Sequence, residues 1–282
     1  MKVLIVGSSS SIGYSIGKNL EHLGQVKFAG RENADFFFDL TFWDTQPTVT
    51  ESFDVVVHVA ADFGGKATED FIRAELVNAV GTLSVCRLAE ACHAKHLIVI
   101  SSISATYQLG DPYYGIYALS KKHAEEAAQL FCSERALALT ILRPSQVYDA
   151  QGKCRKHQPL LYRMADKAQA GENIYLYGDH DPLRNYLYLE DLSEICSRVV
   201  ETGITGNFDC VHPLNPRLSE VAEAAFSAFA NGGEVQFQAD KPNLLDLPLV
   251  TSSSLYEEIG FYPLVDIKQG FEHIRQFRVS KL

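Results

Sequence analysis

The N-terminal stretch Lys2–Gly13, KVLIVGSSSSIG, decides the fold of this chain. Residues 2–6 are an almost continuous apolar run, which is typical of a parallel strand buried on both faces. The run enters a loop with glycines at Gly7 and Gly13, and a helical pattern follows with four apolar residues on one face: Ile12, Ile16, Leu20 and Leu23. A turn of this kind directs backbone N–H groups at a pyrophosphate. Because Ser10 replaces the middle glycine of a G-x-x-G-x-x-G loop, the stretch is either a dinucleotide-binding loop or a structural turn.

Strands and helices alternate along the rest of the chain. Apolar runs predict strands at 26–29, 34–40, 54–61, 96–102, 139–142 and 205–211. Helical periodicity predicts helices at 69–94, 117–138, 192–201, 219–230 and 265–277. The alternation predicts an α/β fold with a doubly wound parallel sheet, the Rossmann arrangement. We expect a Rossmann domain at 1–149, to which 186–211 returns, and a smaller C-terminal lobe at 150–185 and 212–282.

Composition and charge argue against several classes of protein. The 282 residues are 46% hydrophobic, which suffices for a large core. The formal net charge of −10 argues against a general nucleic-acid binder. We find no signal peptide and no apolar run of membrane-spanning length, so we expect a cytoplasmic protein without a membrane partner. The six cysteines lack C-x-x-C spacing, which favours buried thiols over disulfides or a metal site.

The stretch Pro112–Lys122, PYYGIYALSKK, carries the candidate chemistry. Tyr117 and Lys121 are four residues apart, so both side chains leave the same face of a helix. A phenol titrates near pH 10, and an ammonium beside it favours the phenolate and lowers that pKa. We therefore expect a tuned acid/base pair, provided that a hydride-transferring group lies next to it. The alternative is an ordinary surface tyrosine and an ordinary surface lysine.

The ends of two expected strands bear on the cofactor. A dinucleotide fold reads the adenosine ribose about 20 residues past the loop, with an acid for the 2′-hydroxyl or an arginine for the 2′-phosphate. Arg31 follows its strand directly and favours NADP, Glu32 keeps NAD possible, and the rival interpretation is a solvated loop. Ala60 and Ala61 close another strand with small side chains, which let a flat cofactor approach the backbone. We expect His58, inside that strand, to be a hydrogen-bonded core residue.

Basic residues gather after the change of character near residue 150. They are Lys153, Arg155, Lys156, His157 and Arg163. A solvated basic face is one interpretation of this cluster, and a phosphate site is the other.

Taken together, the chain resembles the extended short-chain dehydrogenase/reductases, in particular the NAD-dependent epimerase/dehydratase family that modifies nucleotide sugars. The resemblance runs in order along nearly the whole chain, on eight motifs. These are VGSSSSIG, Asp39-Leu40, HVAA, Asn78-Ala-Val-Gly81-Thr82, SSISATY, YALSK, RPSQVYD and GDHDPLRNYLYLED. They are similar to the family's VTGxxGxIG, Asp-hydrophobic pair, HxAA, NxxGT, SSxxxY, YxxxK, RPxxVYG and GxGxxxRD[FY][IV]xVxD.

The resemblance implies roles for residues of the Rossmann domain. Tyr117 would be the general acid/base on a sugar hydroxyl or ketone, and Lys121 would hold the nicotinamide ribose. A serine would share the substrate oxygen's hydrogen bond; counting back from Tyr107 places Ile103 there, so we favour Ser102, with Ser104 as the other candidate. Further cofactor contacts would come, besides Arg31, Tyr117 and Lys121, from Gly7, Ser9, Ser10, Ser11, Ile12, Gly13, Asp39, Leu40, Ala60, Ala61, Asn78 and Pro144.

The resemblance also implies a substrate site and narrows the reaction. Substrate contacts would come from Ser102, Gln146, Lys156, His157 and Arg184, the last on the nucleotide diphosphate, since an arginine fork suits phosphate. Dehydratases of the family carry an acidic pair just after the catalytic Ser/Thr, but Ile103-Ser104-Ala105 lacks a carboxylate. We therefore expect a keto-sugar reductase or a 4-epimerase, and the short chain slightly favours a reductase.

Two further expectations concern the class of protein and its assembly. Some proteins of the superfamily are non-catalytic NAD(P)-binding sensors or interaction proteins, and these usually lack the Tyr–Lys pair. Retention of Tyr117 and Lys121 favours an enzyme. In the family, the helices expected at 69–94 and 117–138 pair across a two-fold axis, so we expect a homodimer.

Overall fold

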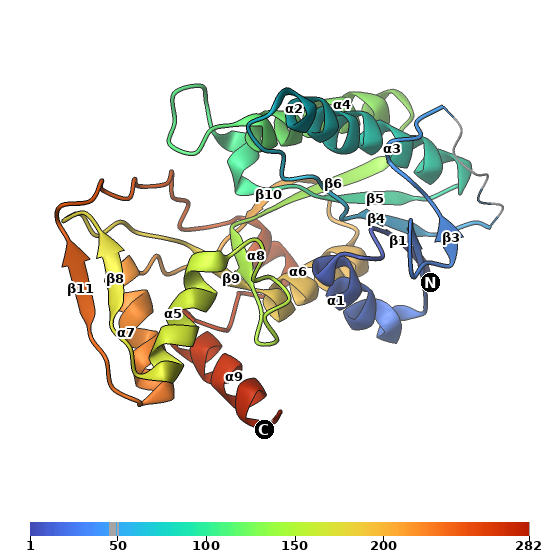
Figure 1. Cartoon of the computed structure of the whole chain (residues 1–282). Coiled ribbons are helices and arrows are strands. Elements are labelled where there is room, and N and C mark those ends of the chain that lie inside the picture. The colour runs from blue at the N-terminus through green and yellow to red at the C-terminus, as the bar shows by residue number, and fades with distance from the viewer. Residues whose placement is uncertain (45–48, 50, 282) are drawn as a thin grey trace. The chain divides into compact units, whose positions relative to one another are not determined.

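The computed structural model describes residues 1–44, 49 and 51–281 (Figure 1). The chain forms two compact units, each built from several segments. Unit 1 contains Met1–Pro144, Ser193–Cys210 and Ser254–Phe261. Unit 2 contains Ser145–Leu192, Val211–Ser253 and Tyr262–Leu282.

Unit 1 is built on one parallel seven-stranded sheet, with the order β10-β6-β5-β4-β1-β2-β3. The strands are β1 (Lys2–Val6), β2 (Gln25–Gly30), β3 (Phe36–Phe37), β4 (Val55–His58), β5 (His96–Ile100), β6 (Ala138–Pro144) and β10 (Gly206–Cys210). The order reverses between β1 and β4, so their carboxyl ends mark the point where ligands bind in sheets of this type.

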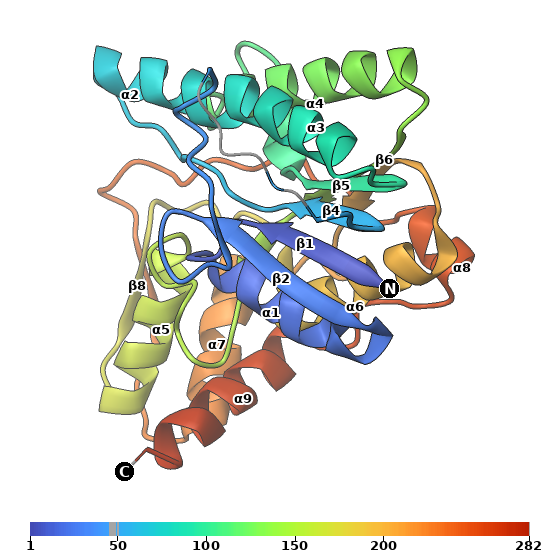
Figure 2. The same ribbon diagram turned by 90° about the vertical axis from the view of Figure 1, so that its right-hand side faces the viewer.

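Helices cover both faces of this sheet (Figures 1 and 2). The first group comprises α2 (Thr68–Ala74), α3 (Gly81–Ala91) and α4 (Ile116–Glu134). The opposite face carries α1 (Ser11–Leu20) and α6 (Leu189–Thr202), while α8 (Leu255–Ile259) completes the unit. The predicted doubly wound α/β fold is confirmed.

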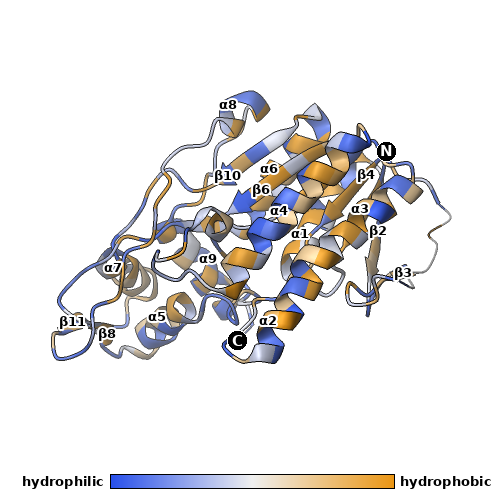
Figure 3. Ribbon diagram, turned by 90° about the horizontal axis from the view of Figure 1, so that it is seen from above, coloured by the Kyte–Doolittle hydropathy of each residue, from blue (hydrophilic) through white to orange (hydrophobic). Residues whose placement is uncertain are grey.

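The central strands are buried because helices cover them on both sides. Every residue of β4 and β5 is buried, as is β1 after Lys2. Valine, isoleucine and leucine dominate these strands, and Figure 3 shows the apolar colour on β4 and on alternating stretches of α2 and α3. Continuous apolar runs of this kind are the sequence signature of a two-sided parallel sheet.

Several predicted boundaries differ from the structure. The strand expected at 34–40 is the two-residue β3, because the Asp39 carboxylate accepts the Thr41 N–H and closes a turn. The helix expected at 69–94 is α2, then a π-helical turn, η2 (Glu75–Val80), then α3. The helix expected to reach 138 ends at Glu134, and Ala136 at φ 51° is left-handed and cannot extend it.

Unit 2 combines helices with two short parallel strand pairs. Its strands are β7 (Gln146–Tyr148), paired with β9 (Tyr186–Tyr188), and β8 (Ile174–Tyr177), paired with β11 (Val235–Gln238). Its helices are α5 (Pro159–Ala170), α7 (Leu218–Phe229) and α9 (Ile267–Val279). The sequence prediction missed α5, although Pro159 at its start and left-handed Gly171 at its end are ordinary boundary signals. None of the described helices is long and apolar enough to cross a membrane.

Candidate functional site

The loop after β1 packs tightly against the end of β4. Gly7 has φ 124°, and a Cβ on it would lie 2.9 Å from the Ala60 nitrogen, so only glycine fits there. A Cβ on Gly13 would lie 2.8 Å from the Gly7 carbonyl oxygen, so the helix start is equally close to the loop. The carboxyl ends of β1 and β4 thus present backbone rather than side chains, an arrangement that suits a flat or phosphorylated ligand.

Ser10, the departure from the glycine-rich pattern, caps α1. Its hydroxyl oxygen accepts the Gly13 N–H at 3.3 Å, and its backbone is extended at φ −77° and ψ 129°. The first turn of a helix carries N–H groups without intrahelical acceptors, and the helix dipole adds positive potential there. Ser9, Ser11 and Ile12 therefore lie where a phosphate is stabilised, with Ser9 exposed and the other two half-buried.

The residues expected around the adenosine have different environments. Arg31 is exposed directly after β2, and the Ser8 hydroxyl donates to the neighbouring Glu32 carbonyl. The Asp39 carboxylate accepts from both the backbone and the hydroxyl of Thr41, at 2.9 and 2.7 Å, and Leu40 is buried. The Arg31 side chain is thus exposed to solvent, whereas the Asp39 carboxylate hydrogen-bonds within its own loop.

Asn78, an expected cofactor contact, holds the loop after β4 to α4. It lies buried in the π-helical turn, where its amide oxygen accepts the Asp62 N–H at 2.8 Å. Its amide nitrogen donates to the Asp62 carbonyl at 2.7 Å and to the Ser120 hydroxyl at 2.8 Å. In the described contacts, the Asn78 amide hydrogen-bonds with other residues of the protein, and these bonds position the loop that carries Ala61.

Tyr117 and Ser102 lie together at the carboxyl end of β5. Tyr117 is in the first turn of α4, half-buried, and its phenol interacts with the Ser102 side chain. Ser104 does not replace Ser102 in this contact, since the Ser104 hydroxyl donates to the Ser102 hydroxyl at 2.8 Å. The Tyr117 ring also stacks on Phe63, with centroids 4.7 Å apart and planes 14° apart, and sequence reasoning missed this contact.

Lys121 lies one turn along α4, buried, and its Nζ donates to the Ile100 carbonyl at 3.1 Å. Burial lowers the pKa of Lys121 to about 8, while the charge of Glu125 raises it. Burial raises the pKa of Tyr117 to about 12, and the interaction with Ser102 lowers it. The expectation that Lys121 lowers the Tyr117 pKa below its ordinary value is therefore wrong for this structure, because desolvation outweighs every favourable contact of the phenol.

His58 is a core residue, as its apolar strand indicated. Its Nε2 lies 3.1 Å from the Thr82 hydroxyl, and burial, together with the Lys121 charge, lowers the pKa of His58 to about 3. The ring is neutral at physiological pH and can contribute no charge to the site. Pro144, at the end of β6, is likewise buried.

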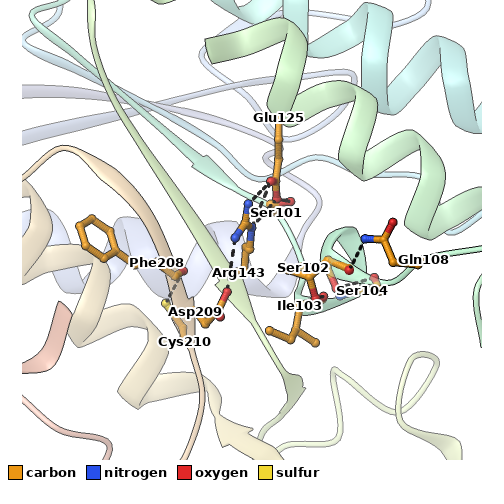
Figure 4. A network of polar contacts seen from close by, with 11 residues as sticks. Ser101, Ser102, Ile103, Ser104, Gln108, Glu125, Arg143, Phe208, Asp209 and Cys210 are labelled. Atoms are coloured by element: carbon orange, nitrogen blue, oxygen red, sulfur yellow. Dashed lines mark hydrogen bonds and ion pairs between the residues drawn. The ribbon is translucent and has the colours of Figure 1, made fainter. Parts of the chain in front are cut away.

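A buried charged network joins α4 to the ends of β5, β6 and β10, and sequence reasoning missed it (Figure 4). Glu125 accepts hydrogen bonds from Ser101 and Arg143, and Arg143 forms an ion pair with Asp209. A sequence signal existed, since Glu125 follows Lys121 by four residues on the same face of the helix.

Of the expected substrate contacts, Ser102 lies in unit 1 and the other four lie in unit 2, where they do not form one cluster by their own hydrogen bonds. Gln146 donates to the Gln158 side chain at 3.1 Å, and its amide oxygen is buried without a hydrogen-bond partner among the described residues. Arg184 is buried and donates to the carbonyls of Leu183 and Leu245 at 2.7 and 2.9 Å. Part of the hydrogen-bonding capacity of the Arg184 guanidinium is thus used by backbone carbonyl groups.

Within the basic cluster the residues differ. Lys156 and His157 are exposed, and partial desolvation of the His157 ring, together with the charge of Lys156, lowers the pKa of His157. Arg155 forms a two-point ion pair with Asp166, at 2.6 and 2.9 Å, so the cluster is less positive than its composition indicated. Over the described ranges, 1–44, 49 and 51–281, no group of three or more His, Cys, Asp or Glu side chains could hold a metal ion.

Comparison with known proteins gives consistent matches. The model of the NAD dependent epimerase/dehydratase family matches residues 3–208, more than half of the chain. UDP-N-acetyl-alpha-D-glucosaminuronate decarboxylase of Bacillus cytotoxicus is 25% identical over 257 residues, covering 80% of this chain and 77% of the relative. UDP-glucose 4-epimerase of Thermus thermophilus, in complex with NAD, has a TM-score of 0.76 at 21% identity and covers 99% of each chain. RMD from Pseudomonas aeruginosa, complexed with NADPH, has a TM-score of 0.78 at 18% identity, over 100% of this chain and 99% of that one.

Proposed function

Because the chain belongs to the NAD dependent epimerase/dehydratase family, we propose that it transfers hydride at a carbon of a nucleotide-diphosphate sugar. The reaction is the reduction of a keto-sugar or epimerisation at C4, with NAD(P) as cofactor. The observation that carries this proposal is the triad of Tyr117, Ser102 and Lys121 at the carboxyl end of β5. None of the three residues Ile103, Ser104 and Ala105 carries a carboxylate, which disfavours a dehydration reaction.

The residues around Gly7 fit a dinucleotide. A Cβ at Gly7 or Gly13 would fill the space between loop, strand and helix, and the start of α1 supplies N–H groups for a pyrophosphate. Arg31, exposed after β2, would meet a 2′-phosphate, so we propose a preference for NADP over NAD. When bound, the nicotinamide supplies or accepts the hydride.

Proton transfer falls to Tyr117. A phenol with a pKa of about 12 is protonated at neutral pH, so Tyr117 Oη can donate a proton to a keto oxygen as that oxygen gains negative charge. The Ser102 hydroxyl, which interacts with the Tyr117 phenol, can donate a second hydrogen bond to the same oxygen. Lys121, with a pKa of about 8, is mostly cationic at neutral pH and would hold the nicotinamide ribose.

Unit 2 would bind the nucleotide sugar. The unpartnered amide oxygen of Gln146 and hydroxyl of Ser145 are buried polar atoms, and such atoms ordinarily have a partner. A sugar hydroxyl both donates and accepts hydrogen bonds, so it would satisfy this pair. Arg184, Lys156 and His157 would meet the diphosphate.

The experiment begins with cofactor binding, measured by the fluorescence change of NADPH and NADH on titration with purified protein. UDP-, dTDP- and GDP-sugars are then screened for thermal stabilisation, because a ligand that binds the native state raises its apparent stability. The sugars that stabilise the protein are assayed by absorbance at 340 nm and by chromatography of the products, which also detects epimerisation. Cofactor binding without turnover of any of these sugars would favour the alternative, a non-catalytic NAD(P)-binding sensor or interaction protein.

The assembly we propose is a homodimer in the cytoplasm. Exposed apolar side chains on α2, α3 and α4 support an interface there: Phe71, Ile72, Leu83 and Leu130. All six cysteines are buried and none forms a disulfide, which fits a reducing compartment.

A further inference from the structure

A carboxylate on α4 binds the ends of two neighbouring strands (Figure 4). The Ser101 hydroxyl, after β5, donates to Glu125 Oε1. Arg143, near the end of β6, donates from Nε to both carboxylate oxygens at 3.0 Å and from a terminal nitrogen to Oε2 at 2.6 Å. The Glu125 side chain is 5% exposed, so these bonds lie out of water.

Arg143 is shared with a second acid. Its other terminal nitrogen lies 3.6 Å from Asp209 Oδ1 on β10, and burial raises the pKa of Asp209. Glu125 and Arg143 cancel in charge, and Asp209 and Lys121 carry opposite charges nearby. The network thus joins α4, β5, β6 and β10 with little net charge, which lowers the cost of burying it.

The network touches the site at two points. Ser101 directly precedes Ser102, whose side chain interacts with the Tyr117 phenol. Lys121 lies one helical turn before Glu125, and its Nζ donates to the carbonyl of Ile100, the residue before Ser101. The segment 100–102 is therefore held by Lys121 on one side and by Glu125 on the other.

We propose that Glu125 is a positioning residue, which fixes Ser102 through its hydrogen bond with Ser101. The roles of Ser102 and Lys121 in this proposal depend on the proposed function, whereas the contacts of Glu125 do not. An isolated buried ion pair contributes little to net stability, so stability alone does not account for an arrangement of one helix and three strands centred on one carboxylate.

The charged and titratable groups that face Lys121 come from α4 and β4. On α4 this is Glu125, and on β4 it is His58, which is neutral. Arg143 pairs with Glu125 and with Asp209 rather than with Lys121. Glu125 is thus the described group whose charge opposes the effect of burial on Lys121, and its loss moves the pKa of Lys121 down from about 8.

The test compares native protein with Glu125→Gln, which keeps the side-chain shape and removes the charge. Affinity for NADPH is measured by fluorescence between pH 6.5 and 9. We expect affinity at pH 8 to fall by about three- to tenfold in Glu125→Gln, because Lys121 loses its proton at lower pH. Glu125→Asp restores the charge and is expected to recover the native pH profile.

Hydrogen exchange of the segment 100–104 provides the second readout, which needs no cofactor. We expect faster exchange in Glu125→Gln and in Ser101→Ala, a milder variant that removes one hydrogen bond if the first does not fold. Thr140→Val on β6 is the matched control: it loses buried bonds to His96 and Ile204 remote from this network, and it should leave the pH profile and the segment 100–104 unchanged.

Native NADPH affinity at every pH, with native exchange at 100–104 in both variants, would overturn the inference. If the native protein binds neither NADPH nor NADH, the proposed function fails instead. The exchange comparison then still decides whether Glu125 positions the segment.

Discussion

Replacing Tyr117 with phenylalanine is the perturbation that separates the candidate chemistry from the packing around it. The variant removes one hydroxyl and keeps the aromatic ring, which stacks on Phe63 with centroids 4.7 Å apart. It also removes the interaction of the phenol with the Ser102 side chain. The structure therefore predicts a small effect on stability and a large effect on rate.

The two magnitudes differ by enough to be distinguished. Loss of one hydrogen bond costs about 1 kcal/mol of stability. Loss of a general acid/base lowers rate by about 10²–10⁴-fold, which corresponds to about 2.7–5.4 kcal/mol of transition-state stabilisation. Turnover in Tyr117→Phe should fall by that factor while NADPH affinity stays close to native, because Lys121 and the loop at Gly7 are unchanged.

The assay measures kcat and KM on the nucleotide sugar that the screen identifies, the NADPH dissociation constant by fluorescence, and unfolding in urea. Tyr114→Phe is the matched control, since it deletes a hydroxyl three residues away and should keep native turnover. A Tyr117→Phe protein that turns over its sugar at the native rate would refute the assignment of Tyr117. A fall in rate that accompanies an equal loss of NADPH affinity would assign Tyr117 to binding and not to proton transfer.

Four further predictions follow from the other contacts of the structure. Arg31→Asp should reverse or abolish a preference for NADPH over NADH in binding titrations, since repulsion replaces attraction at the 2′-phosphate, and equal native affinities would contradict the assignment of Arg31. Ser102→Ala should lower kcat by at least about tenfold, whereas Ser104→Ala should keep kcat within a few-fold of native, because of the two serines it is Ser102 that interacts with Tyr117. Steady-state kinetics with the opposite ranking would make Ser104 the catalytic serine. His58 has a pKa of about 3 in the folded protein, so between about pH 6.5 and pH 3 the unfolded chain binds a proton there and the folded protein does not, and the free energy of unfolding falls as the pH drops. Urea unfolding of His58→Gln should show a smaller loss of stability over this pH range. The same pH dependence in native protein and variant would contradict this prediction. Light scattering at micromolar concentration should give the mass of a dimer, and a mass near 31.3 kDa would exclude the proposed interface.

The sequence by itself determined the fold and the location of the chemistry, because these depend on local patterns. Continuous apolar strands alternating with helical periodicity leave a two-sided parallel sheet as the arrangement that buries them. The glycine at Gly7 follows from a turn that no other residue accommodates at φ 124°. Tyr117 and Lys121 share a face because their spacing matches the helical turn.

Only the tertiary structure decided which groups surround these residues. Glu125 finds Ser101 and Arg143 at separations of 24 and 18 residues, and no local pattern reports such contacts. The sequence alone does not tell Ser102 from Ser104 as the serine beside Tyr117. In the structure, the short helical turn at Ile103–Thr106 directs the Ser104 hydroxyl at the Ser102 hydroxyl, and Ser102 is the serine that interacts with Tyr117. The sign of the Tyr117 pKa shift was predicted incorrectly for the same reason: spacing reports a neighbouring charge, whereas burial, which raises the pKa to about 12, depends on everything packed around the phenol.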